Sequence, residues 1–333
     1  MVSSLADESA LLTQLRELAD QGRYREVLDR LRGLPAAALE GRTAFALFAA
    51  EAHGRQGDHA EARRWAELAL VAARARGERP TELRALNYQG AIALRHGDVD
   101  EAEQRFGDAL NLARTVRDPA AQARCLNNLG IIAWFKGDAE TALASYQLAL
   151  AAYQQAGLVR GMAETHHNIG ISWLERRDHL RALQAAEQAV RLATVAGDET
   201  LVGLAFTGRA EIHLLIGDHD LAAVELERAA EAYRRVNFAA GLPEVWRLQA
   251  AVAGTRGDLP GQLRLLRQAA ELATTQGSAE SLAAIERDLG AALQRSGDSA
   301  GANAARRRAL TLYQRLGATR AARDIAALIA PSS

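Results

Sequence analysis

A Gly-Asp dipeptide recurs at intervals of forty residues along this chain of 333 residues. The six copies are Gly57-Asp58, Gly97-Asp98, Gly137-Asp138, Gly217-Asp218, Gly257-Asp258 and Gly297-Asp298. At the remaining slot of the series the sequence reads Arg177-Asp178. A fixed period in this range is typical of a solenoid, in which each repeat is a small unit that buries its apolar face against the next. The chain is therefore expected to be a stack of such units.

Each repeat is predicted to be a pair of helices. In the second full repeat, apolar residues at helical spacing predict a first helix over about 82–96. Gly97 is expected to end this helix, because glycine adopts the left-handed conformation without strain. Asp98 would begin the second helix, about 99–115, as its N-cap, and Glu101 would complete a capping box. The predicted fold class is all-α, an α-solenoid of antiparallel helix pairs.

Small residues occupy the same columns in successive repeats. One column of the second helix is alanine throughout, at Ala69, Ala109, Ala149, Ala189, Ala229, Ala269 and Ala309. Another is alanine except for Gln262, at Ala62, Ala102, Ala142, Ala182, Ala222 and Ala302. The first helix has a column of Ala50, Gly90, Gly130, Gly170, Ala210, Ala250 and Gly290. These columns are predicted to lie in the core, where helices approach closely and a larger side chain would overpack the site.

The columns resemble the tetratricopeptide repeat. The family's second-helix pattern of alanine, an aromatic residue and a second alanine is matched by Ala142-x-x-x-Tyr146-x-x-Ala149. Trp246 stands where the family has its first-helix tryptophan. The period of forty is similar to that of the long repeats in kinesin light chain, Pins-type adaptors and Rap-type bacterial peptide sensors. The resemblance implies a right-handed superhelix whose first helices line a concave groove, and it covers nearly the whole chain.

The repeats are expected to form a single superhelix over residues 1–333. Residues 5–40 are predicted to be a shortened unit with a turn at Gly22-Arg23, residues 41–318 seven full helix pairs, and residues 319–330 a capping helix. Incomplete ends are expected, since an end repeat exposes one face to water.

The Arg177 slot predicts a local irregularity. Arginine there must either adopt a left-handed conformation or loosen the turn, because its Cβ atom disfavours positive φ. We therefore expect the superhelix to be irregular at this point.

Composition excludes several classes of protein. The formal net charge is −1, so no global field attracts nucleic acid or an anionic membrane. No stretch approaches the length of about 20 apolar residues needed to span a membrane, and the first residues lack a signal-peptide pattern. The lone Cys125 excludes a disulfide framework and a cysteine zinc site. We expect a cytoplasmic protein with neither a nucleic acid nor a membrane as its partner.

Signals for catalysis are weak. The sole lysine, Lys136, is followed by Gly137-Asp138, which excludes the Gly-Lys-Ser/Thr phosphate loop. His166 and His167 near Glu164 could suggest a metal site, but adjacent residues on a helix point about 100° apart. We expect no enzyme activity, no cofactor and no metal.

A ligand is expected on the face of the first helices that the core columns leave free. The predicted lining is Arg84, Asn87, Tyr88, Arg124, Asn127, Asn128, Ile131, Trp134, Phe135, Glu164, His167, Asn168, Glu175 and Glu211. Asparagine both donates and accepts hydrogen bonds, so a ladder of Asn127, Asn128 and Asn168 could hold the backbone of an extended peptide. The long-repeat families use similar asparagines in this way.

Other interpretations of these residues remain open. The asparagines could equally bond between neighbouring helices, and Trp134 could belong to the core. The change from arginine at Arg84 and Arg124 to glutamate farther along could orient a ligand or could be a solvated face.

The function expected from the sequence is reversible binding of a peptide or an extended protein segment by a scaffold or adaptor. The alternative is a sensor module that binds a signalling peptide or small molecule and changes its superhelical pitch. The sequence does not predict an oligomeric state.

Overall fold

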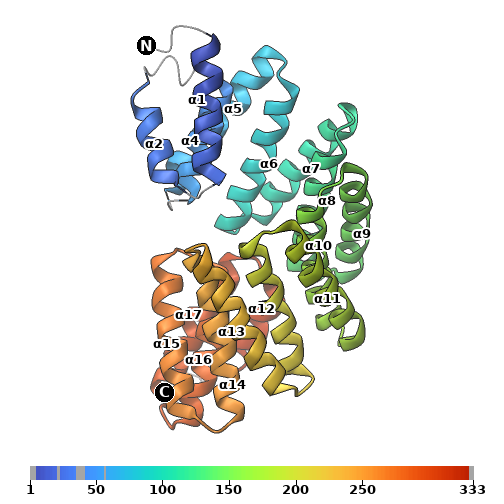
Figure 1. Ribbon diagram of the computed structural model, residues 1–333. Helices are drawn as coiled ribbons and strands as arrows, with labels where there is room; N and C mark the ends of the chain where they lie inside the picture. Colours follow the sequence, from blue (N-terminus) through green and yellow to red (C-terminus); the bar gives the residue numbers. More distant parts are fainter. Residues whose placement is uncertain (1–4, 21–22, 35–41, 56–57, 330–333) are drawn as a thin grey trace. The chain divides into compact units, whose positions relative to one another are not determined.

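The computed structural model describes residues 5–20, 23–34, 42–55 and 58–329, which form seventeen α-helices, one 3-10 helix and no strand (Figure 1). The predicted all-α fold of stacked helix pairs is therefore confirmed. The expected turn residues Gly22 and Gly57, and residues 35–41 at the junction of the expected first and second units, lie outside this description. Among the described residues, no helix combines the length and the apolar character needed to cross a membrane.

The chain forms two compact units, Met1–Cys125 and Leu126–Ser333, and the boundary falls within α8 (Pro119–Phe135). The first unit also contains α1 (Leu5–Asp20), α2 (Tyr24–Arg32), α4 (Thr43–Arg55), α5 (His59–Arg76), α6 (Arg79–His96) and α7 (Val99–Thr115). The second unit continues with α9 (Ala139–Ala156), α10 (Val159–Glu175), α11 (His179–Ala196), α12 (Glu199–Leu215), α13 (His219–Arg235), η1 (Ala239–Gly241), α14 (Leu242–Thr255), α15 (Leu259–Thr275), α16 (Ala279–Arg295), α17 (Ser299–Arg315) and α18 (Thr319–Ala326).

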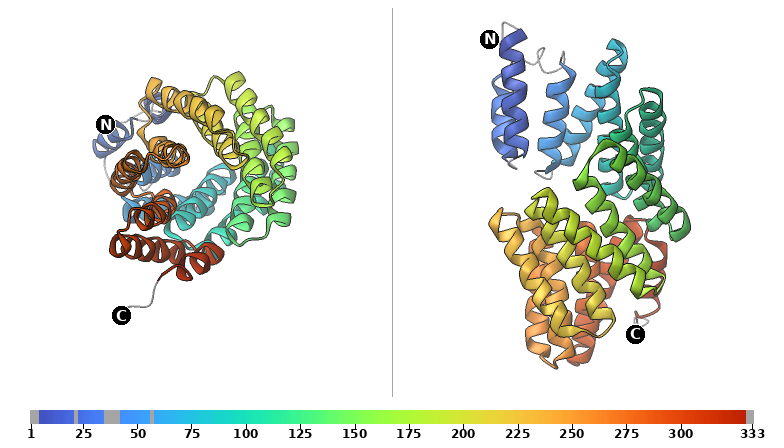
Figure 2. Two further views of the ribbon diagram at one scale, coloured as in Figure 1. Left: turned by 90° about the horizontal axis from the view of Figure 1, so that it is seen from below. Right: turned by 45° about the vertical axis from the view of Figure 1, so that its right-hand side comes forward.

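From α4 onward, the even-numbered helices are the first helices of the repeats and the odd-numbered helices are the second. In the second unit the members of each pair lie side by side (Figure 2). Helix α10 also packs against α12, α12 against α14, and α14 against α16. Successive second helices make no comparable contacts within the described part of residues 126–333. The first helices of this unit therefore lie closer to one another than the second helices do, which makes their common side the concave one.

The Gly-Asp turns act as a stop followed by a cap. Gly97 and Gly137 have φ of 85° and 81°, the left-handed conformation that ends a helix. The Asp138 carboxylate then accepts a hydrogen bond from the Thr141 backbone N–H at 3.0 Å. The capping box expected at Asp98 and Glu101 was wrong: the Asp98 side chain caps nothing, and Glu101 instead accepts a 2.7 Å hydrogen bond from an arginine of α5.

The expected irregularity at Arg177 was also wrong. Arg177 has φ of 59°, and its backbone N–H donates to the Leu174 carbonyl at 2.9 Å. The equivalent hydrogen bond from Gly137 to Trp134 is also 2.9 Å long. Arginine therefore adopts the glycine conformation and keeps the turn, at a cost of about 1–2 kcal/mol for a left-handed residue with a side chain.

The predicted alanine columns do form the core. Every alanine listed for the two second-helix columns is at most 1 % exposed. In the first-helix column, a Cβ atom on Gly90 would lie 2.7 Å from the Phe106 ring, and one on Gly130 would lie 2.5 Å from the Tyr146 ring. Glycine here allows an aromatic ring of the second helix to lie directly against the backbone of the first.

Candidate ligand-binding face

Side chains on four consecutive first helices meet on one side of the second unit. We call this surface the first-helix face. It comprises the same five positions of each helix. These are 164, 167, 168, 171 and 175 of α10; 204, 207, 208, 211 and 215 of α12; 244, 247, 248, 251 and 255 of α14; and 284, 287, 288, 291 and 295 of α16. All five predicted ligand-binding residues that lie on α10 and α12 belong to it. Three kinds of contact build it.

An asparagine pair joins α8 to α10. Asn127 is 6 % exposed, and its Oδ1 accepts hydrogen bonds from Asn168 Nδ2 and Thr165 Oγ1, each at 3.1 Å. These contacts connect neighbouring first helices, which is the structural role that the sequence left open for the asparagines. Asn168 itself is half-buried.

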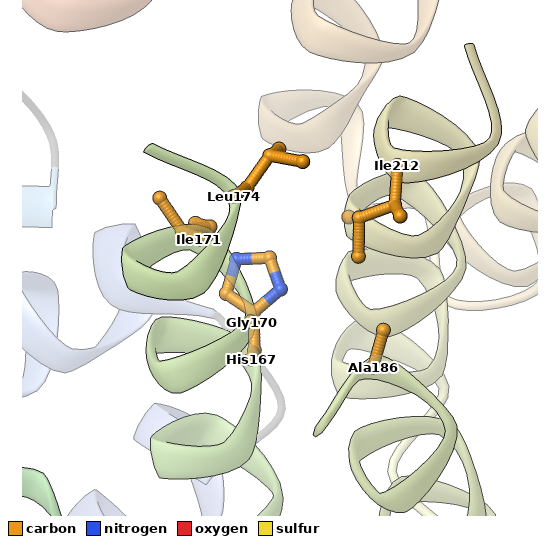
Figure 3. Close-up of a pocket in the computed structure, with 7 residues that line it drawn as sticks. His167, Gly170, Ile171, Leu174, Ala186 and Ile212 are labelled. Atoms are coloured by element: carbon orange, nitrogen blue, oxygen red, sulfur yellow. The ribbon is translucent and has the colours of Figure 1, made fainter. Parts of the chain in front are cut away.

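The second contact is between His167 and α12. The imidazole lies against Gly208, where a Cβ atom would be only 2.6 Å from His167 Nδ1. Burial lowers the pKa of His167 to about 4, so the ring is neutral at physiological pH. The ring borders a small pocket with Ile171 and Leu174 of α10 and Ile212 of α12 (Figure 3).

The third contact is an ion-pair cluster centred on Arg247 of α14. Its guanidinium bonds to Glu211 of α12 at 2.9 Å, to Asp288 of α16 at 2.8 Å and to Glu244 of its own helix at 2.6 Å. Arg287 adds a 2.8 Å contact to Asp288. One buried arginine therefore ties three consecutive first helices together.

Desolvation shifts the pKa values of this cluster. Burial raises the pKa of Glu211, although Arg247 opposes the shift. Burial alone would raise the pKa of Asp288, but Arg247 and Arg287 together hold it below its ordinary value. Burial by surrounding protein, reinforced by Glu244, raises the pKa of Glu280 even though this residue is exposed to solvent.

The sequence analysis identified Glu211 but missed the rest of this cluster. The columns that hold Arg84, Asn87 and Tyr88 repeat every forty residues. Farther along the chain, these columns contain Glu244, Arg247, Arg287 and Asp288. Extending those columns past Glu211 would have found them. Glu280 does not belong to these columns, and no sequence signal pointed to it.

The remaining predicted residues of the second unit take no part in these three contacts, although Glu164 and Glu175 also lie on the first-helix face. Ile131 and Trp134 pack, partly buried, against the hydrophobic cluster around Tyr146. Phe135 meets Trp134 edge to face, with ring centroids 4.9 Å apart. Glu164 pairs along its own helix with an arginine, and Glu175 is exposed with a pKa that burial raises. Asn128 is half-buried.

The predicted residues of the first unit form a separate set. Tyr88 is half-buried, and its hydroxyl donates to the Ala50 carbonyl of α4 at 2.8 Å, so it joins neighbouring first helices. Arg84 and Arg124 are exposed, and Asn87 is half-buried. Burial and the two neighbouring arginines Arg16 and Arg124 lower the pKa of Arg84, whereas Glu51 opposes the shift.

Cys125 is fully buried, and burial raises the pKa of its thiol to about 12, so it is unreactive as a nucleophile. Among the described residues, no group of three or more histidine, cysteine or carboxylate side chains is placed to hold a metal ion.

Comparison with known proteins identifies the repeats. A tetratricopeptide-repeat family model matches residues 42–115 and 97–155. Residues 42–155 of this chain are therefore tetratricopeptide repeats. The same turns and alanine columns continue through α17, so the tetratricopeptide pattern extends well beyond the matched residues. A search of curated proteins found no match.

Several solved structures share the fold at low sequence identity. One is the Rap conjugation gene regulator of the plasmid pLS20 in complex with a Phr peptide, with a TM-score of 0.69, 12 % identity, and coverage of 82 % of this chain and 74 % of that one. Another is NprR in complex with its cognate peptide NprX, with a TM-score of 0.59, 13 % identity, and coverage of 96 % and 98 %. A third is aspartyl phosphate phosphatase F from Bacillus subtilis, with a TM-score of 0.55, 12 % identity, and coverage of 100 % and 98 %.

Proposed function

We propose that this tetratricopeptide-repeat protein reversibly binds a peptide, or an extended segment of another protein, on the first-helix face of its second unit. The observation that carries the proposal is the Arg247 cluster, which gathers charged side chains from three first helices on one concave surface. Perturbed pKa values concentrate on the same surface, as is typical of binding sites.

The mechanism is preorganisation. Arg247 and its three carboxylate partners hold the side chains of α12, α14 and α16 in place before a ligand arrives, so little ordering entropy is lost on binding. The Glu211 oxygen that does not bond to Arg247 can then accept a hydrogen bond from a peptide backbone, and the amide of Asn168 can donate or accept one. Two of the solved structures that share this fold were determined with bound peptides, which supports the same use of the fold here.

The charges disfavour nucleic acid as the partner. The cluster holds three carboxylates, on Glu211, Glu244 and Asp288, against the two guanidinium groups of Arg247 and Arg287, and Glu280 adds a fourth carboxylate that interacts with Glu244. A phosphate backbone would be repelled by this excess of negative charge. The proposal is for binding and not for catalysis, since the carboxylates around Arg247 are engaged in ion pairs.

A sensor is the second candidate function. Arg247 bonds to three consecutive first helices, so a ligand that draws one carboxylate away from it would change how these helices pack. Binding would then alter the pitch of the repeats, and the peptide-bound regulators that share the fold support this possibility.

Replacing Arg247 tests the proposed function. A peptide is first selected against the full chain from a random library, and its affinity is then measured for Arg247→Met by fluorescence anisotropy. We expect affinity to fall at least about tenfold, because the carboxylates lose their common partner and repel one another.

The matched control is Arg209→Met. Arg209 is also mostly buried and pairs with Glu225 at 2.5 Å, but this pair joins α12 to α13 within one repeat. Arg209→Met should keep the wild-type affinity. Equal losses in both variants, or no loss in Arg247→Met, would contradict the proposed site.

A further inference from the structure

Where the two helices of a repeat approach most closely, a large side chain normally fills the space between them. In the α6–α7 and α8–α9 pairs, Phe106 and Tyr146 lie against a glycine. In the α12–α13 and α14–α15 pairs, the fully buried Leu226 and Leu266 occupy the equivalent position. Every one of these pairs is therefore closed by an aromatic ring or a leucine.

Where both helices carry alanine at this point, a side chain from the next repeat fills the space between them. In the α4–α5 pair, Ala50 and Ala66 leave space, and Tyr88 of α6 packs into it. The Tyr88 hydroxyl reaches the Ala50 carbonyl at 2.8 Å, which anchors the ring there.

The α10–α11 pair has neither a large side chain of its own at this point nor one supplied by the next repeat. Its two positions are Gly170 and Ala186, and Gly208 of α12 stands where α6 has Tyr88. The result is a pocket with a cavity volume of about 10 Å³, enough for one water-sized group (Figure 3). Figure 3 shows the His167 ring between the α10 backbone and Ile212.

His167 gives the pocket its one polar group. Within the described part of the chain, neither ring nitrogen of His167 has a hydrogen-bond partner. The ring is neutral, because burial lowers its pKa to about 4. It therefore offers one donor and one acceptor beside otherwise apolar walls.

We propose that this pocket is a specificity subsite of the first-helix face and that it takes a small uncharged side chain of the bound peptide, alanine or serine. This inference rests on the proposed peptide-binding function. The available volume matches a methyl group, and the hydroxyl of serine, the next larger side chain, can pair with His167. Charged side chains are excluded because the apolar walls of Ile171, Leu174 and Ile212 would desolvate them.

Filling and enlarging the pocket tests the inference. The probe is the library-selected peptide, remade with each position changed in turn to glycine, alanine, serine, leucine, lysine and glutamate. Wild-type protein should show one position where alanine and serine bind at least about tenfold more tightly than leucine, lysine or glutamate. Ala186→Leu, which introduces the residue found at positions 226 and 266, should leave glycine as the best residue at that position. Leu174→Ala should instead make leucine acceptable there.

The control is Ala196→Leu, at an exposed site at the end of α11, the helix that carries Ala186. This variant should leave the preference for alanine and serine unchanged. If Arg247→Met weakens binding but neither pocket variant changes the preference, the pocket is not a subsite and the proposed function stands. If Arg247→Met has no effect, or no library peptide binds, the proposed function fails and this inference fails with it. Ala186→Leu reduces the pocket volume and Leu174→Ala increases it, so the two variants should shift the preferred residue in opposite directions. A loss of stability in one variant would not produce this pair of shifts.

Discussion

At the residue scale, the environment decides what each charged side chain does. Arg247 is 7 % exposed and keeps its charge because three carboxylates surround it. Glu280 is exposed and forms no ion pair with any described residue, and both burial and Glu244 raise its pKa. A raised carboxylate pKa means that the folded protein binds the proton more tightly than the unfolded chain. Ionisation of Glu280 therefore costs stability at neutral pH, and the cost disappears as the carboxyl group is protonated.

Glu280→Gln should accordingly stabilise the protein at about pH 7 and have no effect at about pH 4, where glutamate protonates. We expect a gain below about 1 kcal/mol, because solvent screens an exposed side chain. The free energy of unfolding is measured by urea denaturation at both pH values.

The matched control for this prediction is Glu231→Gln. A hydrogen bond from Arg235 lowers the pKa of Glu231, so removing this charge should destabilise slightly at about pH 7. A gain from Glu280→Gln that is equal at both pH values would show that its charge is not responsible.

At the element scale, glycines in one column have different roles. A Cβ atom on Gly90 would overlap Phe106 at 2.7 Å, whereas one on Gly170 would meet its nearest atom, the Ala182 carbonyl oxygen, at an ordinary 3.4 Å. The first glycine is required by a buried ring, and the second lies beside the pocket. The sequence alone showed the column but not this distinction, because the distinction depends on which residue of the second helix lies opposite.

Gly90→Ala and Gly170→Ala should therefore change stability in opposite directions. Gly90→Ala is expected to cost about 1–3 kcal/mol by overpacking against Phe106. Gly170→Ala should gain up to about 1 kcal/mol, since alanine favours a helix over glycine and meets no clash. Urea denaturation followed by circular dichroism measures both. Similar losses in the two variants would mean that the packing around Gly170 is as tight as that around Gly90.

At the scale of the whole molecule, the forty-residue period predicted the helix pairs, their turns and the alanine core, because each depends on spacing along the chain. The partner of each side chain depends on the neighbouring repeat and could not be predicted in this way. Asn127 was expected to meet a ligand but bonds to Asn168, and Arg177 was expected to disturb its turn but adopts the glycine conformation. The division at Cys125 and Leu126 within α8 likewise had no signal in the repeats.

The central claim is that the first helices of the second unit form the ligand-binding face. Hydrogen–deuterium exchange of the full chain, with and without the library-selected peptide, tests it most directly. We predict that the peptide slows exchange in α10, α12, α14 and α16, because a bound ligand stabilises the helices that it contacts. Slowed exchange confined to the second helices α11, α13 and α15, with the first helices unchanged, would contradict the claim.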